Sequence, residues 1–248
     1  YFSLELAQRI RVEWGPAKIV TANRVFANVA DLADMTEGIR HLLEPDGVFV
    51  FETGYVVDIL ENDLFETIYH EHLGYDSTKP LTTFFRRHQM EIIDMERLSI
   101  KGGSLRGTVR LADGSGTVAP SVSSMIAVED SLGIHSVAPF RAFTERIDAR
   151  KIELAKCLAK LKESGKTIAG YGAAQPSTTM IFQFDLGDTL SFMVDDDPKN
   201  QGRYSPGHHI PVLAPDAIYH QEPDYVLILA WRYSEPIIKK HQAYLDQG

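Results

Sequence analysis

Four consecutive residues, Tyr69-His70-Glu71-His72, bring together a phenol, two imidazoles and a carboxylate. The imidazole has an unperturbed pKa closer to neutral pH than any other side chain, and a neighbouring carboxylate or phenol can orient it or share its proton. These residue types at this spacing indicate a site that could remove a proton at neutral pH. Polar clusters are also common in surface loops, so the cluster alone leaves a purely structural interpretation open.

The elements before this cluster predict a sheet edge that would position it. Lys18 to Thr21 and Val48 to Phe51 are short apolar runs that predict buried strands, and a helix capped by Asp31 is expected between them. This alternation predicts a βαβ unit with parallel strands. Ligands of open α/β sheets bind beyond the carboxyl ends of the strands, where Asn23 and Glu52 lie. We therefore expect these two residues to contact a cofactor, although Asn23 could equally be a turn residue.

The remainder of the first half predicts further helices and an antiparallel hairpin. Ser3 is available to cap a helix that Gly15-Pro16 ends, and Pro45-Asp46-Gly47 predicts a turn. A helix is expected after the histidine cluster, over residues 79–88. Residues 91–98 and 104–111 predict two strands joined around Lys101-Gly102-Gly103. We expect a first domain over residues 1–112.

The second half predicts a connection and then a smaller α/β domain. Residues 113–124 are rich in Gly, Ser, Thr, Ala and Pro, so residues 113–139 are expected to form a linker. Apolar residues at helical spacing from Phe140 to Leu161 predict a long helix that Gly165 stops. Alternating strands and helices then predict a Rossmann-like domain over residues 140–248. The expected strands are 167–170, 190–194 and 225–230, and the expected helices are 177–184, 216–220 and 236–245.

Two motifs of this second domain are candidates for ligand binding. Gly170-Tyr171-Gly172 follows a predicted strand and resembles half of a phosphate-binding loop, although a tight strand-to-helix turn explains it equally well. Lys199 and Arg203 could hold a diphosphate, because the guanidinium fork suits phosphate oxygens. A metal site at His208-His209 with the preceding aspartates is disfavoured, because adjacent histidines project apart; no metal is expected.

Composition excludes several classes of protein. A net charge of -9 over 248 residues argues against nucleic acid as a partner, since phosphate binding needs clustered Lys and Arg. The single cysteine, Cys157, excludes an internal disulfide and is expected to pack in a helix core. There is neither a membrane-length apolar run nor a signal-peptide pattern, so we expect a soluble cytoplasmic protein. Because the chain opens with Tyr1 inside a predicted helix, we expect it to be part of a longer polypeptide.

Several separated motifs together resemble the S-adenosylmethionine-dependent C-methyltransferases that act on nucleotide-linked deoxy keto sugars. An antiparallel end to the first sheet is also usual in S-adenosylmethionine methyltransferases. The motifs that carry the resemblance are Tyr69-His70-Glu71-His72 after Asp58-Ile59-Leu60, Gly102-Gly103-Ser104-Leu105-Arg106, Gly170-Tyr171-Gly172-Ala173, Gln201-Gly202-Arg203-Tyr204 with Pro206-Gly207, and Pro223-Asp224-Tyr225-Val226-Leu227 with Ala230-Trp231.

The resemblance implies a partial class I methyltransferase sheet followed by a Rossmann-like domain that binds the nucleotide sugar. It implies S-adenosylmethionine as cofactor, with the glycine-rich turn for it, and the cysteines of a zinc module, upstream of Tyr1. By resemblance His72 is the base, Glu71 orients it or binds a hydroxyl, and Tyr69 is a donor near the sugar. The implied substrate-binding residues are Tyr171, Lys199, Arg203, Tyr204 and His208.

Some positions depart from the family pattern and leave the exact sugar open. Asn28 and Lys101 stand where members often have histidine, and Ala174-Gln175-Pro176-Ser177 replaces a Lys-containing segment. Two other functions also stay open. The chain could be a non-catalytic module that binds a nucleotide sugar, or an NAD-dependent enzyme that uses the Gly170 turn with Asp195 as the ribose-binding acid.

Overall fold

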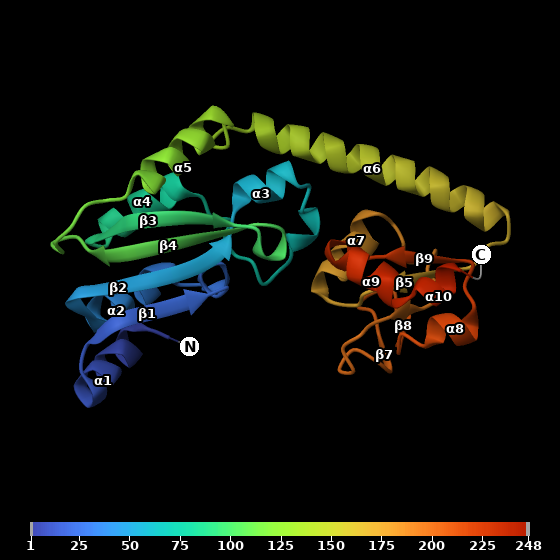
Figure 1. The fold of residues 1–248 in the computed structure, drawn as a ribbon, viewed down its shortest axis with the longest axis horizontal. Helices are drawn as coiled ribbons and strands as arrows, with labels where there is room; N and C mark the ends of the chain where they lie inside the picture. The colour runs from blue at the N-terminus through green and yellow to red at the C-terminus, as the bar shows by residue number, and fades with distance from the viewer. Residues whose placement is uncertain (1, 247–248) are drawn as a thin grey trace. The chain divides into compact units, whose positions relative to one another are not determined.

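The computed structural model describes residues 2–246 and confirms an α/β protein (Figure 1). The chain divides into two compact units. Unit 1 comprises Tyr1–Leu64 and His70–Phe143, and unit 2 comprises Phe65–Tyr69 and Thr144–Gly248. The two units are described separately below.

Within the described residues, the sheet of unit 1 has four strands in the order β1-β2-β4-β3. Strands β1 and β2 are parallel, whereas β4 is antiparallel to both of its neighbours. The predicted βαβ unit and the predicted hairpin are therefore both present. The strands are β1 (Ala17–Asn23), β2 (Leu43–Gly54), β3 (Met90–Leu98) and β4 (Ser104–Leu111), and the first helices are α1 (Leu4–Trp14), α2 (Leu32–Leu42), α3 (Val56–Glu61) and α4 (Thr78–Arg87).

Local sequence signals explain where these elements begin. The Ser3 hydroxyl accepts a hydrogen bond from the Leu6 N–H, and the Asp31 carboxylate caps α2 in the same way. The turn expected at Pro45-Asp46-Gly47 is instead an irregularity inside β2, where the pairing with β1 shifts register. A Cβ at Gly47 would lie 2.8 Å from a β1 carbonyl oxygen, so the close approach of the two strands favours glycine.

An aromatic cluster forms the core of unit 1. Phe49 and Phe51 project from the same face of β2, because side chains two residues apart on a strand share a face. Their rings pack against Phe26, which follows β1, and Phe85 of α4, with centroid separations between 5.2 and 6.2 Å. This packing holds α4 against the sheet, behind it in the view of Figure 1.

Residues 113–139 are expected to form a linker, but the structure has a helix there, α5 (Pro120–Ser131), which belongs to unit 1. The Ala119 N–H bonds the Ile93 carbonyl, and the Ser121 hydroxyl accepts from the Met95 N–H, so this segment covers the outer edge of β3. The serine-rich composition hid the helix because its stability comes from these tertiary contacts rather than from an amphipathic pattern.

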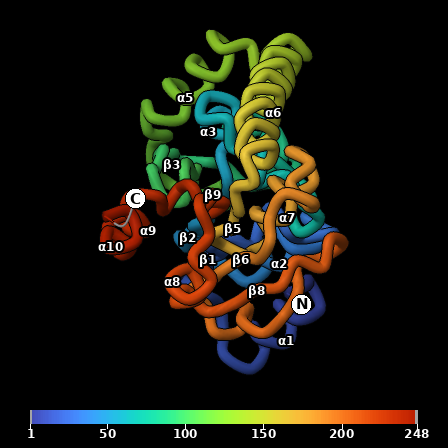
Figure 2. Tube along the Cα trace, turned by 90° about the vertical axis from the view of Figure 1, so that its right-hand side faces the viewer, coloured from blue at the N-terminus to red at the C-terminus, as the bar shows by residue number. Residues whose placement is uncertain are grey.

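Unit 2 is the predicted Rossmann-like domain, with the strand order β7-β8-β6-β5-β9. Figure 2 shows α7 on one side of the central strands and α8, α9 and α10 on the other. The strands are β5 (Ile168–Tyr171), β6 (Met193–Val194), β7 (Arg203–Tyr204), β8 (Pro211–Leu213) and β9 (Tyr225–Ile228), and the helices are α7 (Gln175–Gln183), α8 (Ala217–Gln221), α9 (Ser234–Lys240) and α10 (Gln242–Leu245). Helix α6 (Ala138–Glu163) begins in unit 1 and belongs to unit 2 from Thr144 onward.

Two expectations for this half differ from the structure. The single helix predicted over residues 236–245 is divided at His241 into α9 and α10, where the backbone (φ of -110° and ψ of 29°) leaves the helical region. The buried His241 ring joins a polar network described below. Cys157 is exposed on α6 rather than packed in a core.

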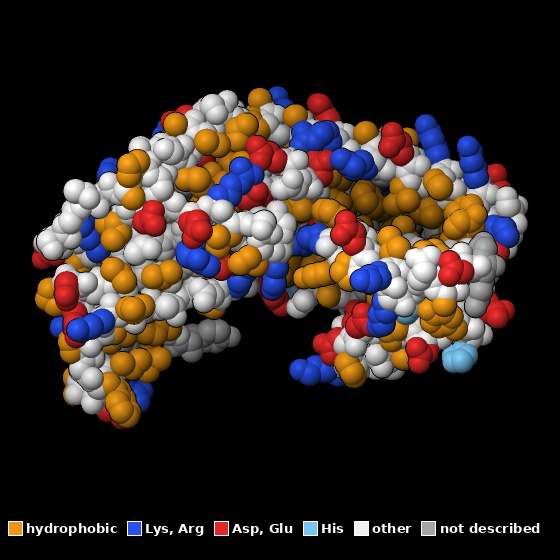
Figure 3. Space-filling view, in the orientation of Figure 1, with side chains coloured by type: hydrophobic (Ala, Val, Ile, Leu, Met, Phe, Trp, Pro, Cys, Tyr) orange, Lys and Arg blue, Asp and Glu red, His pale blue; other side chains and the backbone are white. Residues whose placement is uncertain are grey.

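The surface offers two further observations. Apolar side chains gather over α1 in Figure 3, where Val12 and Trp14 are 89% and 78% exposed. Across residues 2–246, the structure contains no helix whose length and hydropathy would let it cross a membrane.

Candidate active site at the carboxyl edge of the unit 1 sheet

The predicted convergence of Asn23 and Glu52 is present in the backbone pairing. The two residues are partners in the parallel β1–β2 register, at the carboxyl ends of their strands. Asn23 is exposed, whereas the Glu52 side chain is buried. The Glu52 carboxylate lies 3.3 Å from Nε of Arg24 and 3.8 Å from Nη2 of Arg106. Glu52 therefore faces two arginines of its own unit.

Arg24 is a residue that sequence reasoning missed. It has a left-handed backbone with φ of 57°, which is uncommon for a residue with a side chain. Its guanidinium donates to the Ser104 hydroxyl at 2.6 Å and to the Ile100 carbonyl at 3.1 Å. Arg24 thus connects the end of β1 to the loop that carries Lys101, and the available signal was a basic residue directly after a buried strand.

The segment that carries His72 lies at this same edge. The N–H groups of Leu73 and Gly74 both donate to the carbonyl of Ala27, at 2.8 and 3.2 Å. Ala27 belongs to the short turn that follows β1, so these bonds bring His72 beside the carboxyl end of that strand. His72 is half-buried, and its ring meets the Tyr75 ring edge-to-face at a centroid distance of 6.3 Å.

The far end of the same segment is attached to β2. The Thr53 hydroxyl donates to the Asp76 carboxylate at 2.6 Å, and the Val56 N–H donates to the Asp76 carbonyl at 3.0 Å. Burial raises the pKa of Asp76 above its usual range, and the Thr53 hydrogen bond opposes this effect. Residues 73–76 therefore span from the end of β1 to the end of β2.

The near end of the histidine cluster belongs to unit 2, and the division between the units falls between Tyr69 and His70. Within unit 2, the Phe65 ring packs on the Phe184 ring at a centroid distance of 4.9 Å. The buried Glu66 carboxylate lies 2.8 Å from the Arg232 guanidinium. Burial raises the pKa of Glu66, and Arg232 opposes this effect.

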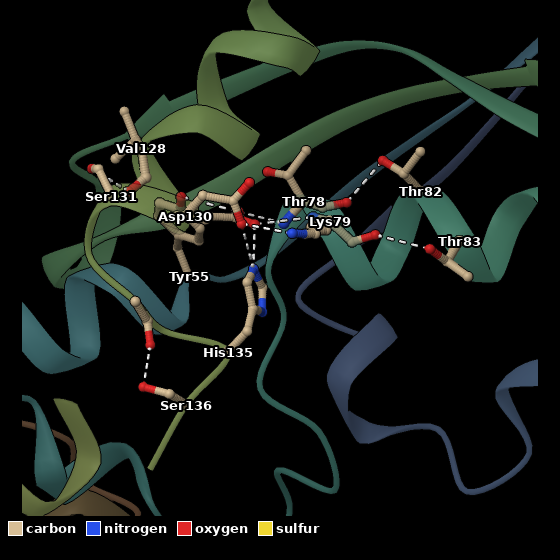
Figure 4. Close-up of polar contacts among 12 residues, drawn as sticks. Tyr55, Thr78, Lys79, Thr82, Thr83, Val128, Asp130, Ser131, His135 and Ser136 are labelled. Carbon is tan, nitrogen blue, oxygen red and sulfur yellow. Dashed lines mark hydrogen bonds and ion pairs between the residues drawn. The ribbon is translucent and has the colours of Figure 1, made fainter. Parts of the chain in front are cut away.

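A second polar cluster in unit 1 has a structural role. The fully buried Glu129 of α5 accepts hydrogen bonds from the Thr78 and Lys79 N–H groups at 2.5 and 3.0 Å and from the Tyr55 hydroxyl at 3.1 Å (Figure 4). Burial and the Glu129 carboxylate raise the pKa of Tyr55 well above its usual range. Glu129 caps the N-terminus of α4, and Tyr55 is part of this buried cluster although it follows the polar end of β2.

The glycine turn of unit 2 already binds a carboxylate of the chain itself. The Gly172 N–H donates to the Val194 carbonyl, and the Ala173 N–H donates to Asp195 at 2.6 Å. The other Asp195 oxygen accepts from the Asp197 N–H at 2.8 Å. The turn thus uses these donors internally, which supports its interpretation as a tight strand-to-helix turn. In this arrangement the glycine turn and the Asp195 carboxylate bond within the chain, which argues against an NAD-dependent enzyme that uses them to bind phosphate and ribose.

Tyr171 is a core residue of unit 2 whose hydroxyl joins a polar network. It is 2% exposed, and its hydroxyl lies 3.1 Å from the Asp196 carboxylate and 3.0 Å from Nε2 of His241. The Tyr219 hydroxyl lies 3.0 Å from Nδ1 of the same ring, and Lys240 forms an ion pair with Asp196. Burial and the Asp196 charge raise the pKa of Tyr171 to about 12.

This network fixes the tautomer of His241. A carboxylate only accepts, so the Tyr171 hydroxyl donates to Asp196 and accepts from Nε2–H of His241. Nδ1 is then the acceptor for the Tyr219 hydroxyl. Burial lowers the pKa of His241 below its usual value and the nearby Lys240 charge adds to the effect, because both disfavour the imidazolium.

The depressed pKa predicts how the stability of unit 2 depends on pH. The contribution of His241 is complete above its unfolded pKa of about 6.5 and is lost as the pH falls below that value, at about 1.4 kcal/mol per pKa unit of depression. We expect the protection factors of the β5 amides, which correct exchange for its intrinsic pH dependence, to fall more between about pH 7 and pH 5 in the wild type than in a His241→Gln variant. His220→Gln, at an exposed histidine of the same unit, should leave the wild-type difference in place. An equal pH response in all three proteins would contradict the role of His241.

The remaining predicted substrate-binding residues lie around β7. Lys199, Arg203 and Tyr204 are exposed, and Tyr204 is 65% exposed. The His208 ring packs on the Phe182 ring at a centroid distance of 4.7 Å. Lys199, Arg203 and Tyr204 are therefore exposed to solvent, whereas Tyr171 is in the core. Among residues 2–246, no three His, Cys, Asp or Glu side chains are grouped as a metal ion would require.

Comparison with known proteins decides the family. The family described as C-methyltransferase C-terminal domain matches residues 99–248. The chain is also 33% identical to the C-methyltransferase NovU of Streptomyces niveus over 248 residues. The chain belongs to the C-methyltransferase family.

The NovU match includes the histidine cluster, because it covers 100% of this chain. The chain spans 59% of the length of NovU. The crystal structure of a SAM-dependent methyltransferase from Anabaena variabilis ATCC 29413 aligns with 44% of this chain and 55% of its own, at 15% identity and a TM-score of 0.34, which is too low to bear on the site.

The residues that sequence reasoning missed in this member of the family have one property in common. Each acts through a partner far away in the chain, so short-range spacing could not reveal it. Arg24 reaches Ser104, Thr53 reaches Asp76, and Glu129 reaches Thr78.

Proposed function

We propose that the complete protein transfers a methyl group from S-adenosylmethionine to a carbon beside the ketone of a nucleotide-linked deoxy keto sugar. The observation that carries this proposal is the attachment of the His72 segment to Ala27, which puts a half-buried imidazole at the carboxyl edge of parallel strands. The cytoplasmic location expected from the sequence stays a prediction.

In the proposed reaction, His72 accepts the proton of the carbon beside the ketone, and the electron pair of that C–H bond forms an enolate. The enolate carbon then forms a bond to the methyl group as the sulfur–carbon bond of the donor breaks. The protein must stabilise the negative charge on the ketone oxygen with a hydrogen-bond donor, for which Tyr69 is proposed. Glu71, exposed beside His72, is proposed to orient the base or to bind a sugar hydroxyl.

Asn23 and Glu52, the two residues predicted to contact the cofactor, differ in how well they suit that role. S-adenosylmethionine supplies an electrophilic methyl group when bound. Asn23 suits a role in holding it, because its amide can donate and accept and is exposed at the end of β1. Glu52 does not suit that role in the described arrangement, since its carboxylate is directed to Arg24 and Arg106. We therefore assign cofactor contact in this chain to Asn23 and a bracing role to Glu52.

For the nucleotide part of the substrate, we propose the exposed group on and beside β7. The Arg203 guanidinium can form two parallel bonds to a phosphate, Lys199 adds positive charge, and the Tyr204 ring offers a face for a base. The core position of Tyr171 and the packing of His208 on Phe182 favour supporting roles for these two residues.

Removal of the Arg203 side chain is expected to weaken binding of a nucleoside diphosphate about tenfold, because a charged hydrogen bond contributes roughly 1.5 kcal/mol or more. Arg203→Lys should fall between wild type and Arg203→Ala, since an ammonium keeps the charge without the fork. Lys156→Ala, at an exposed position of α6, is the matched control. Isothermal titration with thymidine diphosphate measures all four proteins, and equal affinities would remove Arg203 from the site.

The proposed reaction is tested with the complete gene product in heavy water. Without methyl donor, a nucleotide-linked keto sugar should gain deuterium at the carbon beside its ketone, and with the donor present it should gain one methyl group. Binding of the sugar without exchange or transfer would support the non-catalytic binding module instead. Both products are distinguished by mass spectrometry.

A further inference from the structure

The segment that follows the proposed base is held to the unit 1 sheet at two points. The first point is the carbonyl of Ala27, which accepts from the Leu73 and Gly74 N–H groups. The second is Asp76, whose carbonyl accepts from the Val56 N–H and whose carboxylate accepts from the Thr53 hydroxyl. Both parts of Asp76, backbone and side chain, are therefore bonded to the carboxyl end of β2 or the residues just after it.

These attachments matter because the residues just before the histidine cluster belong to unit 2. Tyr69, only three residues before His72, is assigned to unit 2, and His72 to unit 1. Within unit 2, the residues just before Tyr69 are tied by the Phe65–Phe184 ring pair and the Glu66–Arg232 ion pair. The bonds of Leu73, Gly74 and Asp76 attach the segment that follows His72 to the unit 1 sheet.

The side chain of Asp76 is suited to this purpose. A 2.6 Å bond from a hydroxyl to a carboxylate oxygen is short, and Asp76 is half-buried, so water competes weakly for the Thr53 donor. Residue 55 and residue 76 also form a parallel bridge, which fixes the direction in which the chain leaves the edge. Tyr75, next to Asp76, is held so that its ring meets His72 at 89°.

We propose that Asp76 is a positioning residue for His72, acting with Thr53 as the clamp that fixes the base-carrying segment to the carboxyl end of β2. This proposal rests on the proposed function of His72. Asp76 does not contact the reacting atoms, and its effect passes through residues 73–75 to the orientation of the imidazole.

The test compares Asp76→Ala with Asp76→Asn in the complete protein. Alanine removes the clamp, so kcat should fall on the order of 100-fold while KM for both substrates stays near wild type, because a small misplacement of a catalytic group costs rate rather than binding. Asparagine keeps an oxygen that accepts from Thr53 and should restore much of kcat. Thr53→Val removes the donor at nearly constant volume, so its kcat should resemble that of Asp76→Ala.

Asp94→Ala is the matched control, because Asp94 also accepts from a serine hydroxyl at 2.6 Å but in the middle of β3. It should leave kcat unchanged. Hydrogen exchange of the Leu73 and Gly74 amides reports the clamp without any turnover, and it should quicken in Asp76→Ala and in Thr53→Val but not in Asp94→Ala.

The outcomes separate this inference from the proposed function. Wild-type kcat and unchanged amide exchange in Asp76→Ala would overturn the clamp. A fall in kcat that asparagine does not restore would also overturn it, since the accepting oxygen would then be irrelevant. If the wild type transfers no methyl group, the proposed function fails, and the exchange of the two amides still decides whether Asp76 holds the segment.

Discussion

Replacement of His72 by alanine is expected to lower the rate of methyl transfer by about 10²–10⁴-fold, the usual contribution of a general base. The imidazole lies at the carboxyl edge of the unit 1 sheet because its neighbours Leu73 and Gly74 bond Ala27 through backbone groups alone. Those bonds do not require the His72 side chain, so the segment and the fold should persist in the variant. The measurement is single-turnover methyl transfer by the complete protein.

Two controls make this result specific. His41→Ala removes another half-buried histidine of unit 1, in the last turn of α2, and should leave the rate unchanged. Deuterium incorporation beside the ketone should be lost together with methyl transfer in His72→Ala, since both need the same proton removal. A variant that loses methyl transfer but keeps deuterium exchange would assign the base to another residue.

Replacement of Glu129 by alanine is expected to lower the free energy of unfolding of unit 1 by about 2–4 kcal/mol. The estimate combines the loss of a helix cap, about 1 kcal/mol, with the cost of leaving the buried Tyr55 hydroxyl without its acceptor, roughly 1–3 kcal/mol. The Thr78 and Lys79 N–H groups lose their acceptor at the same time. Urea denaturation measures the change in the free energy of unfolding. Hydrogen exchange of the α4 amides shows whether the loss of stability arises at that helix.

The neighbouring residue provides the control for this variant. Asp130 pairs with Lys79 at 2.7 Å, but both side chains are about half exposed. An exposed ion pair contributes at most about 1 kcal/mol, so Asp130→Ala should change the stability little. Equal destabilisation by the two substitutions would mean that burial of Glu129 is not the source of its effect.

The parts of the fold that the sequence predicted are those with strong local signals. Apolar runs located β1 and β2, Ser3 and Asp31 marked the starts of α1 and α2, and a double glycine marked the hairpin of β3 and β4. Helix α5 escaped prediction because it is held by contacts to the edge of β3. Strands β7 and β8 contain only two and three residues, which is too short for a period of two to be visible.

In the candidate site too, some features could be predicted from the sequence and others could not. The pairing of Asn23 with Glu52 followed from the rule that carboxyl ends of parallel strands lie together. The partners of Glu52 did not, because Arg24 and Arg106 reach it through the tertiary structure. Tyr171 was expected at a binding surface because it lies in a glycine turn, yet a residue at the end of a central strand is more readily part of the core.

The Asp195 carboxylate in the glycine turn of unit 2 has a consequence for any anion that approaches it. A group held within 2.6 Å of the Ala173 N–H by the chain itself competes at an effective concentration that a dissolved phosphate cannot reach. The Asp195 carboxylate therefore blocks the Ala173 N–H from binding another anion. A small neutral residue in place of Asp195 would free the Ala173 N–H, whereas the Gly172 N–H would stay bonded to the Val194 carbonyl.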